Sequence, residues 1–486
     1  FQHRIWLWIG AVFGANAVLT VLQFYGLLPQ VLDVGGLVIR GRLIPAGLLG
    51  EVNSGGFLFG LAALIMVYYL VAEEDNRLRL VALLVLGVNL LGLAYTRTLT
   101  AVIGVAACSA IWLVFHHWWL FRFRRDAARR SLVTLWLFLT IFLAGVLFIG
   151  REAGLSARLA SAWSLVQHGH WSAVTAGRQP VYKLTGSMIR ERPISGRGLN
   201  SFGEDFFYYK AESEAGQSVR LLSQPGAFRE VHNEYLQVWA ELGLLGLLLF
   251  LSLFAIPVIR SFVMLRDEED GKRSYWIGIL TIGLIFVGID CLAFFPLHVT
   301  VAAFYVVFLL ACLRYFQNPS GQESEGDTVL TPGKMLAGVA VLLLLTVGVG
   351  YFQAKKWAVN RQLEVAAFLL ERASAGTFTA AQKRVFADEA LSRLEAAEAL
   401  APVMPELHNL RGSALMMVGR FPDAIASYQE AAQRIPSPEV LTNLAAAFIA
   451  DRQFNMAEES VTLALRYEPA YPKALEARNY LARVRE

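Results

Sequence analysis

Long apolar runs, separated by short polar segments, dominate most of this chain. Nine of them approach the roughly 20 residues that a helix needs to cross the hydrocarbon core of a bilayer. Helices satisfy their backbone hydrogen bonds internally, which is what a lipid-facing segment requires. We therefore predict an all-α, polytopic transmembrane bundle, with spans at about 5–28, 54–72, 79–95, 100–121, 131–150, 234–259, 274–292, 297–316 and 335–353.

The connection 122–130 gives this bundle an orientation. It carries five arginines, at positions 122, 124, 125, 129 and 130, and the positive-inside rule places it in the cytoplasm. Alternation then puts loops 73–78 and 260–273 inside. The connections at 29–53, 96–99, 151–231 and 293–296 fall outside, and the polar, Gly-containing segment 318–327 is a cytoplasmic linker. The chain starts at Phe1 close to an apolar segment, so we expect further transmembrane helices to precede it.

Residues 354–486 follow a different pattern, with helical periodicity and polar faces. Two units align at a spacing of 33 residues, Gly412, Ala424, Tyr428, Ala431 and Pro436 against Ala445, Ala457, Val461, Ala464 and Pro469. Small residues at helix crossings and a closing proline resemble the tetratricopeptide repeat, and a generic helical bundle is the alternative. We predict two domains, 1–353 in the membrane, including loop 151–231, and 354–486 as TPR-like repeats.

The composition of the chain argues against a soluble protein and against a nucleic-acid-binding protein. The 486 residues are 56% hydrophobic and 17% charged, whereas a soluble domain carries roughly a quarter charged residues. The net charge of +4 is small and scattered, so we expect no nucleic-acid partner. The three cysteines lie in apolar runs, which predicts no disulfide framework.

Several polar features fall on the predicted outer side. Arg97 stands between two apolar helices, where it is costly unless it lines a polar cavity or binds an anion; snorkelling to the interface is the alternative. Loop 29–53 contributes Arg42 and Asn53. Farther on, Arg178 stands at the start of a short amphipathic helix that includes Tyr182 and Lys183 and is expected to lie on the membrane surface. A Pro-x-x-Gly-x-Gly turn at 193–198 then leads back towards the membrane.

The segment His232-Asn233-Glu234-Tyr235 begins the next apolar helix. Helical stepping puts Tyr235, Trp239, Gly243 and Gly246 on the face of His232, and Glu241 on the opposite face. An imidazole there can accept a proton at neutral pH, although a capping role is the usual alternative. Asp290 and His298 flank the turn 293–296, with pairing to a loop arginine as the alternative to function. His168 and His170 are interpreted as a solvated loop.

In this order and spacing, these residues resemble the O-antigen ligase and polymerase superfamily over about 35–260, most specifically at 228–250. The resemblance implies transfer of a glycan from undecaprenyl diphosphate to an acceptor hydroxyl at the periplasmic face, without a metal ion or other cofactor. Single-step displacement predicts inversion at the anomeric carbon. The implied location is a bacterial inner membrane, with the site and the C-terminal domain facing the periplasm.

The resemblance also implies roles for the residues. His232, Arg178 and Arg97 would be catalytic, the arginines by binding the diphosphate. The substrate-binding residues would be Arg42, Asn53, Tyr182, Lys183, Asn233 and Tyr235.

Family acceptors are the lipid A core, another glycan, or protein Ser and Thr; we favour a ligase, with polymerase and protein transferase as alternatives. Membrane lipids would surround the bundle, and the repeats would dock a periplasmic protein or the acceptor. A non-enzymatic scaffold acting through the repeats is the alternative of a different class. It predicts that Arg97, Arg178 and His232 are separate and dispensable. Transport is less favoured, because the spans have almost no ionisable residues at the midplane.

Overall fold

The computed structural model describes residues 4–25, 27, 38–39, 42–43, 52–123, 155–169, 178–199, 201–212, 230–318, 351, 355, 358–374, 378–400 and 404–485. The chain forms two compact units, residues 1–199 with 230–322, and residues 200–229 with 323–486. Within the described residues, segment 201–212, which the sequence placed with the membrane domain, clusters with the C-terminal helices. The fold is all-α except for a hairpin of β1 (Val38–Ile39) and β2 (Arg42–Leu43).

The first unit is a bundle of apolar helices. They are α1 (Arg4–Phe24), α2 (Val52–Ala72), α3 (Asn76–Thr96), α4 (Leu99–Phe123), α11 (Glu234–Asp267), α12 (Gly271–Asp290) and α13 (Thr300–Gln317). Six of these are long and apolar enough to cross a membrane, and the apolar part of α13 is shorter. The prediction of a polytopic helical membrane protein is confirmed. The predicted spans 131–150 and 335–353 lie outside the described residues.

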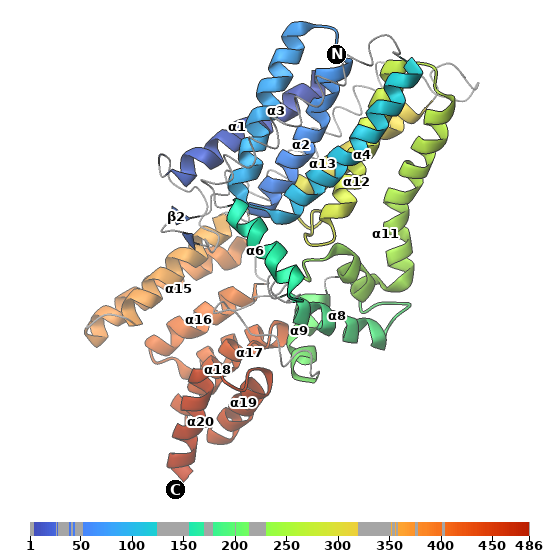
Figure 1. Ribbon diagram of the computed structural model, residues 1–486. Coiled ribbons are helices and arrows are strands. Elements are labelled where there is room, and N and C mark those ends of the chain that lie inside the picture. Colours follow the sequence, from blue (N-terminus) through green and yellow to red (C-terminus); the bar gives the residue numbers. More distant parts are fainter. Residues whose placement is uncertain are drawn as a thin grey trace, which may run out of the picture. The chain divides into compact units, whose positions relative to one another are not determined.

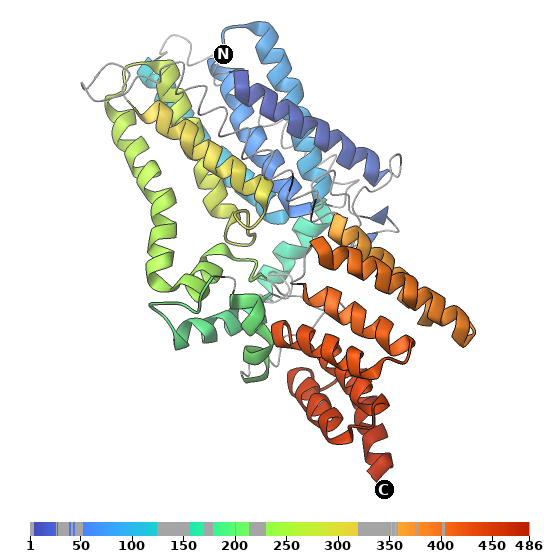
Figure 2. The same cartoon turned by 180° about the vertical axis from the view of Figure 1, so that it is seen from behind.

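Burial separates the helices at the centre of this bundle from those at its margin. Helix α2 is apolar on all sides, which is typical of a fully enclosed helix, and it packs against α1, α3, α4 and α12. In an apolar stretch of 18 residues in α2, 89% of the residues are buried. In the corresponding stretch of α11, 11% are buried. Both views show α11 standing at the edge of the bundle (Figures 1 and 2). Most of the apolar surface of α11 is therefore not covered by the other described helices.

Antiparallel connections gather two sets of helix ends, which we name outer and inner after the orientation predicted from the sequence. The outer set contains the end of α1, the start of α2, the α3–α4 turn, the start of α11 and the α12–α13 turn. The inner set contains the α2–α3 and α11–α12 turns and the end of α4. Contacts tie the inner set together: Lys272 Nζ lies 3.1 Å from Glu74 Oε1, and Arg122 Nη2 donates to the Glu268 carbonyl at 3.2 Å.

Two helices of the same unit lie between α4 and α11 in sequence. They are α6 (Leu155–Gln167) and α8 (Gln179–Glu191). Helix α8 is the predicted amphipathic helix, and it buries Val181, Leu184, Thr185, Met188 and Ile189. It packs on α11.

The second unit is a series of antiparallel helices. They are α9 (Ser201–Glu212), α15 (Ala380–Leu400), α16 (Pro405–Met417), α17 (Phe421–Arg434), α18 (Pro438–Ala450), α19 (Phe454–Tyr467) and α20 (Pro472–Arg485). Each packs mainly on the next along the chain from α15 to α20 (Figure 2). Gly412 permits close approach, since a Cβ there would lie 2.6 Å from the Tyr428 ring. The two aligned units coincide with the pairs α16–α17 and α18–α19, and their TPR-like character stays a prediction.

Helix α9 belongs to this unit through a buried cation. The Lys210 side chain is 2% exposed, donates to the Tyr467 carbonyl at 2.7 Å and forms an ion pair with Glu468. The ring of Phe207 also contacts Tyr467. An ammonium group is rarely buried unless it is paired, so this contact fixes α9 against the end of α19.

Candidate functional site

His232 occupies a strained backbone position just before α11. Asn233 caps the helix, with its side-chain oxygen accepting from the Leu236 N–H at 3.0 Å. His232 therefore precedes the helix, and its φ of 58° lies in the left-handed region. Non-glycine residues adopt that region at a cost and mostly where surrounding contacts impose it. The imidazole is consequently directed by the turn and by its neighbours, not by helical periodicity.

The predicted helical face of His232 is therefore wrong. Besides the late start of α11, Gly243 interrupts the helix with φ 70° and ψ −171°. Positions before and after this break do not share one helical phase. Periodicity cannot detect such an interruption, because it assumes a continuous helix. The Glu241 carboxylate accepts a hydrogen bond from Gln237 Nε2 at 3.2 Å.

The break at Gly243 receives the turn 193–198. The Leu244 N–H donates to the Pro193 carbonyl at 2.8 Å, and the Gly198 N–H donates to the Glu241 carbonyl at 2.8 Å. A Cβ on Gly243 would lie 2.0 Å from the Ile194 oxygen, and one on Gly196 would lie 2.2 Å from the Glu241 oxygen. The two glycines thus let two backbones interlock, which positions α8 against the first turns of α11.

Arg178 and Tyr182 of α8 meet the His232 segment. Arg178 is the N-cap residue of α8, as predicted, and its Nη1 donates to the Ala293 carbonyl at 3.1 Å. The Tyr182 hydroxyl donates to the His232 carbonyl at 3.3 Å. Residues far apart in sequence are thereby brought together at the outer end of the bundle. Lys183, in contrast, is exposed.

The surroundings of His232 keep its imidazole neutral. Burial, with a contribution from the positive charge of Arg178, lowers the pKa of His232 to about 3. Its ring contacts Phe295 edge-on, with centroids 4.9 Å apart. Its Nδ1 atom is buried, and no described residue supplies it with a hydrogen-bond partner. The neutral ring thus keeps a buried nitrogen without a hydrogen-bond partner among the described residues.

A second set of side chains forms hydrogen bonds around the segment that contains His232. The Val231 N–H donates to Gln237 Oε1 at 3.0 Å, and Gln237 Nε2 lies 3.3 Å from His298 Nε2. His298 Nδ1 lies 3.1 Å from a carboxylate oxygen of Glu234, whose side chain is 2% exposed. The hydrogen bond to Glu234 raises the pKa of His298.

The sequence did not assign Glu234 or Gln237 a role. It marked His298 only as a residue flanking the turn 293–296, whereas the structure pairs His298 with the Glu234 carboxylate. Glu234 and Gln237 could have been recognised as candidate site residues from the sequence, because both follow His232 within five residues.

Asn233 and Tyr235 act through structure in the described contacts. The Asn233 amide caps α11 with its oxygen, and its nitrogen donates to the Leu292 carbonyl at 2.9 Å. The Tyr235 hydroxyl donates to the Gly288 carbonyl at 2.7 Å. These bonds join the start of α11 to the end of α12. Their predicted substrate contacts stay predictions.

Arg97 and Asn53 lie in a neighbouring group at the outer end. Arg97 ends α3 with φ 56°, and Asn53 lies in the first turn of α2. The two turns pack closely, because a Cβ on Gly56 would lie 2.6 Å from Thr98. Ring contacts run from Phe57 at the start of α2 through Phe294 and Phe295 to His232, in steps of 6.4, 4.9 and 4.9 Å.

Two predictions about this outer end fall partly or wholly beyond the described structure. The backbone of Arg42 lies in β2, while its side chain lies outside the described residues. His170 is also outside them. Among the residues that the structure does describe, no group of three or more His, Cys, Asp or Glu side chains is arranged to hold a metal ion.

Comparison with known proteins gives a family match over part of the chain. No curated protein matches the chain. The family model described as O-antigen ligase matches residues 82–251. That range begins in α3 and includes Arg97, Arg178, His232 and the break at Gly243. Residues 82–251 are thus similar to the O-antigen ligase family, which supports a glycan-transfer role in the assembly of surface polysaccharide for a multi-pass protein of the inner membrane.

Proposed function

We propose that this protein transfers a glycan from undecaprenyl diphosphate to an acceptor hydroxyl at the periplasmic face. The observation that carries the proposal is the joining of Arg178, Tyr182 and His232, which come from two segments linked by the interlocked glycines. A cation and an unused imidazole nitrogen at one end of a membrane bundle fit a reaction with an anionic leaving group and a hydroxyl acceptor. The scaffold alternative needs no such arrangement.

Arginine side chains would bind the donor diphosphate. A guanidinium group binds phosphate oxygens in pairs and stays charged at all relevant pH values. Arg178 would hold the diphosphate beside His232, with Arg97 as the second cation and Arg42 as the third. As the glycosidic bond breaks, negative charge grows on the leaving diphosphate, and fixed cations near it lower the barrier.

His232 would take the proton of the acceptor hydroxyl. In the structure its pKa of about 3 makes it a weak base, partly because Arg178 lies near it. A bound diphosphate would offset the Arg178 charge and so raise the pKa of His232. The base would then become effective only after the donor has bound. Attack by the acceptor oxygen from the opposite side would invert the anomeric carbon, and the proposed route uses neither a metal ion nor another cofactor.

The periplasmic orientation rests on the basic residues at the opposite end. Arg122, Arg266, Lys272 and Arg273 lie at the inner helix ends, which the positive-inside rule assigns to the cytoplasm. The His232 end then faces the periplasm. The repeat unit would lie there as well and offer a docking surface for a periplasmic protein or for the acceptor. Among acceptors we favour the lipid A core, with polymerase and protein transferase as alternatives.

The test is transfer from an undecaprenyl-diphosphate-linked glycan in reconstituted membranes. We expect His232→Asn to reduce transfer about 10²–10⁴-fold, the usual contribution of a general base. Asparagine tolerates the left-handed backbone of this position better than alanine does, so the turn is expected to stay folded. Arg190→Ala serves as the control, because Arg190 is exposed on the same α8 and bonds Ser187.

Several outcomes separate the proposal from its alternatives. Full transfer by the His232→Asn protein would contradict the role of His232. Wild-type protein that never discharges the carrier, with each of the three acceptor classes supplied, would contradict the transferase and favour the scaffold. Discharge with one acceptor class alone would identify the branch of the family.

A further inference from the structure

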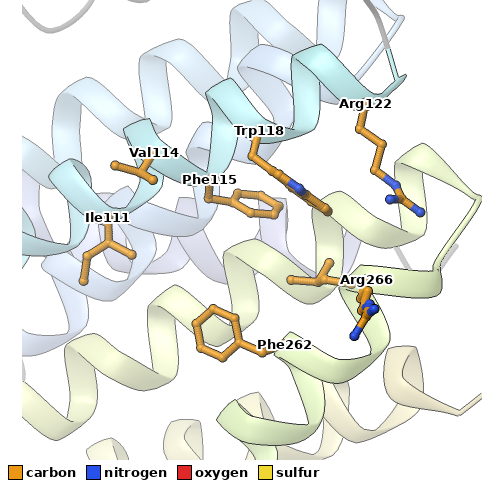
Figure 3. A pocket seen from close by; sticks show the side chains of 8 residues that line it. Ile111, Val114, Phe115, Trp118, Arg122, Phe262 and Arg266 are labelled. Carbon is orange, nitrogen blue, oxygen red and sulfur yellow. The ribbon is translucent and has the colours of Figure 1, made fainter.

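An apolar pocket lies between α4 and α11 at the inner end of the bundle. Its volume is about 580 Å³, and it is lined by Ile111, Val114, Phe115, Trp118, Arg122, Phe262, Leu265 and Arg266. Figure 3 shows the α4 side chains facing those of α11 across the gap, with the two arginines together at one end. The pocket is thus apolar along its length and cationic at its mouth.

The pocket exists because α11 packs mainly on other helices. Its main partners among the described helices are α8, α12 and α13, and apolar side chains on the side facing α4 are left exposed. Val114 is 73% exposed and Phe262 is 64% exposed. Membrane helices attract each other mainly through close packing, and the described residues of α4 and α11 pack little against each other along this seam. A molecule with hydrocarbon chains would supply such packing.

The mouth of the pocket has the chemistry of an anion site at the membrane interface. The Arg122 guanidinium stands 5.7 Å from the Trp118 ring and 5.4 Å from the Phe123 ring, and it donates to the Glu268 carbonyl. Arg266 comes from the opposite helix. Two guanidinium groups on separate helices suit one phosphate, and tryptophan is enriched at headgroup depth.

We propose that this pocket binds an anionic phospholipid. The phosphate would lie between Arg122 and Arg266, and an acyl chain would lie along Ile111, Val114 and Phe262. Basic pockets between transmembrane helices on the cytoplasmic side recognise such headgroups. The lipid would fill the seam between α4 and α11 and hold α11 against the bundle.

This site is separate from the proposed glycan-transfer site. From Gly243 to Arg266 the helix rises about 35 Å at 1.5 Å per residue, so the two sites lie at opposite ends of α11. The lipid proposal does not depend on the transfer reaction.

The experiment is native mass spectrometry of the full chain, purified in mild detergent and titrated with phosphatidylglycerol or phosphatidylcholine. We expect wild-type protein to retain phosphatidylglycerol preferentially. Arg122→Gln or Arg266→Gln should weaken retention about fivefold, and the double variant about thirtyfold, at about 1 kcal/mol for each cation. Arg260→Gln is the matched control, because Arg260 lies on α11 outside the pocket lining.

A second variant tests the apolar part. Val114→Trp adds bulk inside the pocket without changing charge, and it should also reduce phosphatidylglycerol retention. Unchanged retention in this variant or in the double arginine variant would overturn the proposal. An equal loss with Arg260→Gln would overturn it too, since general surface charge would then explain binding.

Photo-crosslinking identifies the occupant directly. A benzophenone amino acid at position 114 should form an adduct with phospholipid in native membranes. An adduct with the chain's own apolar segment 131–150, or with a second copy of the chain, would overturn the lipid assignment.

Discussion

Arginines stand at both ends of this bundle, in different surroundings. At the outer end, Arg178 is half-buried, bonds a backbone carbonyl and changes the pKa of a neighbouring histidine. At the inner end, Arg122 and Arg266 are exposed beside an apolar pocket. Fixed charge in a partly dry site acts strongly on reacting groups, whereas exposed charge is screened and serves binding or orientation. Environment, not residue type, separates the proposed roles.

The largest expected effect distinguishes these two ends. Arg178→Gln should reduce glycan transfer about 10²–10³-fold, the cost of removing one stabilising group from a charged transition state. Arg260→Gln, a matched change towards the inner end of α11 and outside the pocket lining, should leave the chemical step nearly unaltered. Transfer assays on both variants in the same membranes measure the contrast. Equal losses would show that the charges act generally on the bundle and not on the reaction.

Arg178→Gln should also change the pH dependence. The Arg178 charge lowers the pKa of His232, so its removal should raise that pKa. The base acts in its neutral form, so activity falls as pH drops through the pKa. The acid limb of kcat/KM should therefore move to higher pH in the variant. An unmoved limb would mean that His232 is not the group that titrates.

The next effect tests the break within α11. Gly243→Ala should destabilise the protein by about 2–4 kcal/mol, because it combines a left-handed backbone with a backbone clash at Ile194. Hydrogen exchange should become faster in turn 193–198. Gly186→Ala is the control: nothing lies within 4 Å of its Cβ position, and an alanine inside α8 should stabilise it by about 0.5–1 kcal/mol. Similar exchange in both variants would contradict the interlock.

A smaller effect extends the comparison to lysines. Lys210→Met should cost about 1–3 kcal/mol, because it leaves the Tyr467 carbonyl and Glu468 without their buried cation. Proteolysis near α9 should become faster. Lys183→Met, at an exposed position, should stay within about 0.5 kcal/mol of wild type. Unchanged proteolysis in the Lys210 variant would show that α9 is held by other contacts.

The smallest effect compares two histidines, since the pKa of His298 is raised and that of His232 is lowered. With its folded-state pKa above 6.5, His298 contributes stability that is fully present below pH 6.5 and is lost as pH rises through the folded pKa. Glu234 is the main cause, and Glu241 and Glu230 add to it. His298→Gln should flatten this part of the stability profile. An unaltered profile in thermal unfolding at several pH values would contradict the pairing.

The sequence predicted most of the bundle and the order of its site residues. Apolar length identified α1 to α4, α11 and α12, because crossing a membrane requires a run of about that length whatever the neighbours are. The amphipathic pattern identified α8 with Arg178 at its start. The motif around His232 identified the family, and residues 82–251 match its model.

The tertiary structure decided what periodicity could not. His232 precedes α11, and Gly243 breaks the helix, because a distant turn inserts its backbone there. His298 pairs with Glu234, 64 positions away in the sequence, and Lys210 pairs with Glu468, 258 positions away. The local sequence indicates which segments form helices and which of their faces are apolar. Contacts between distant segments depend on which backbones can approach each other, and here glycines and buried charges determine that.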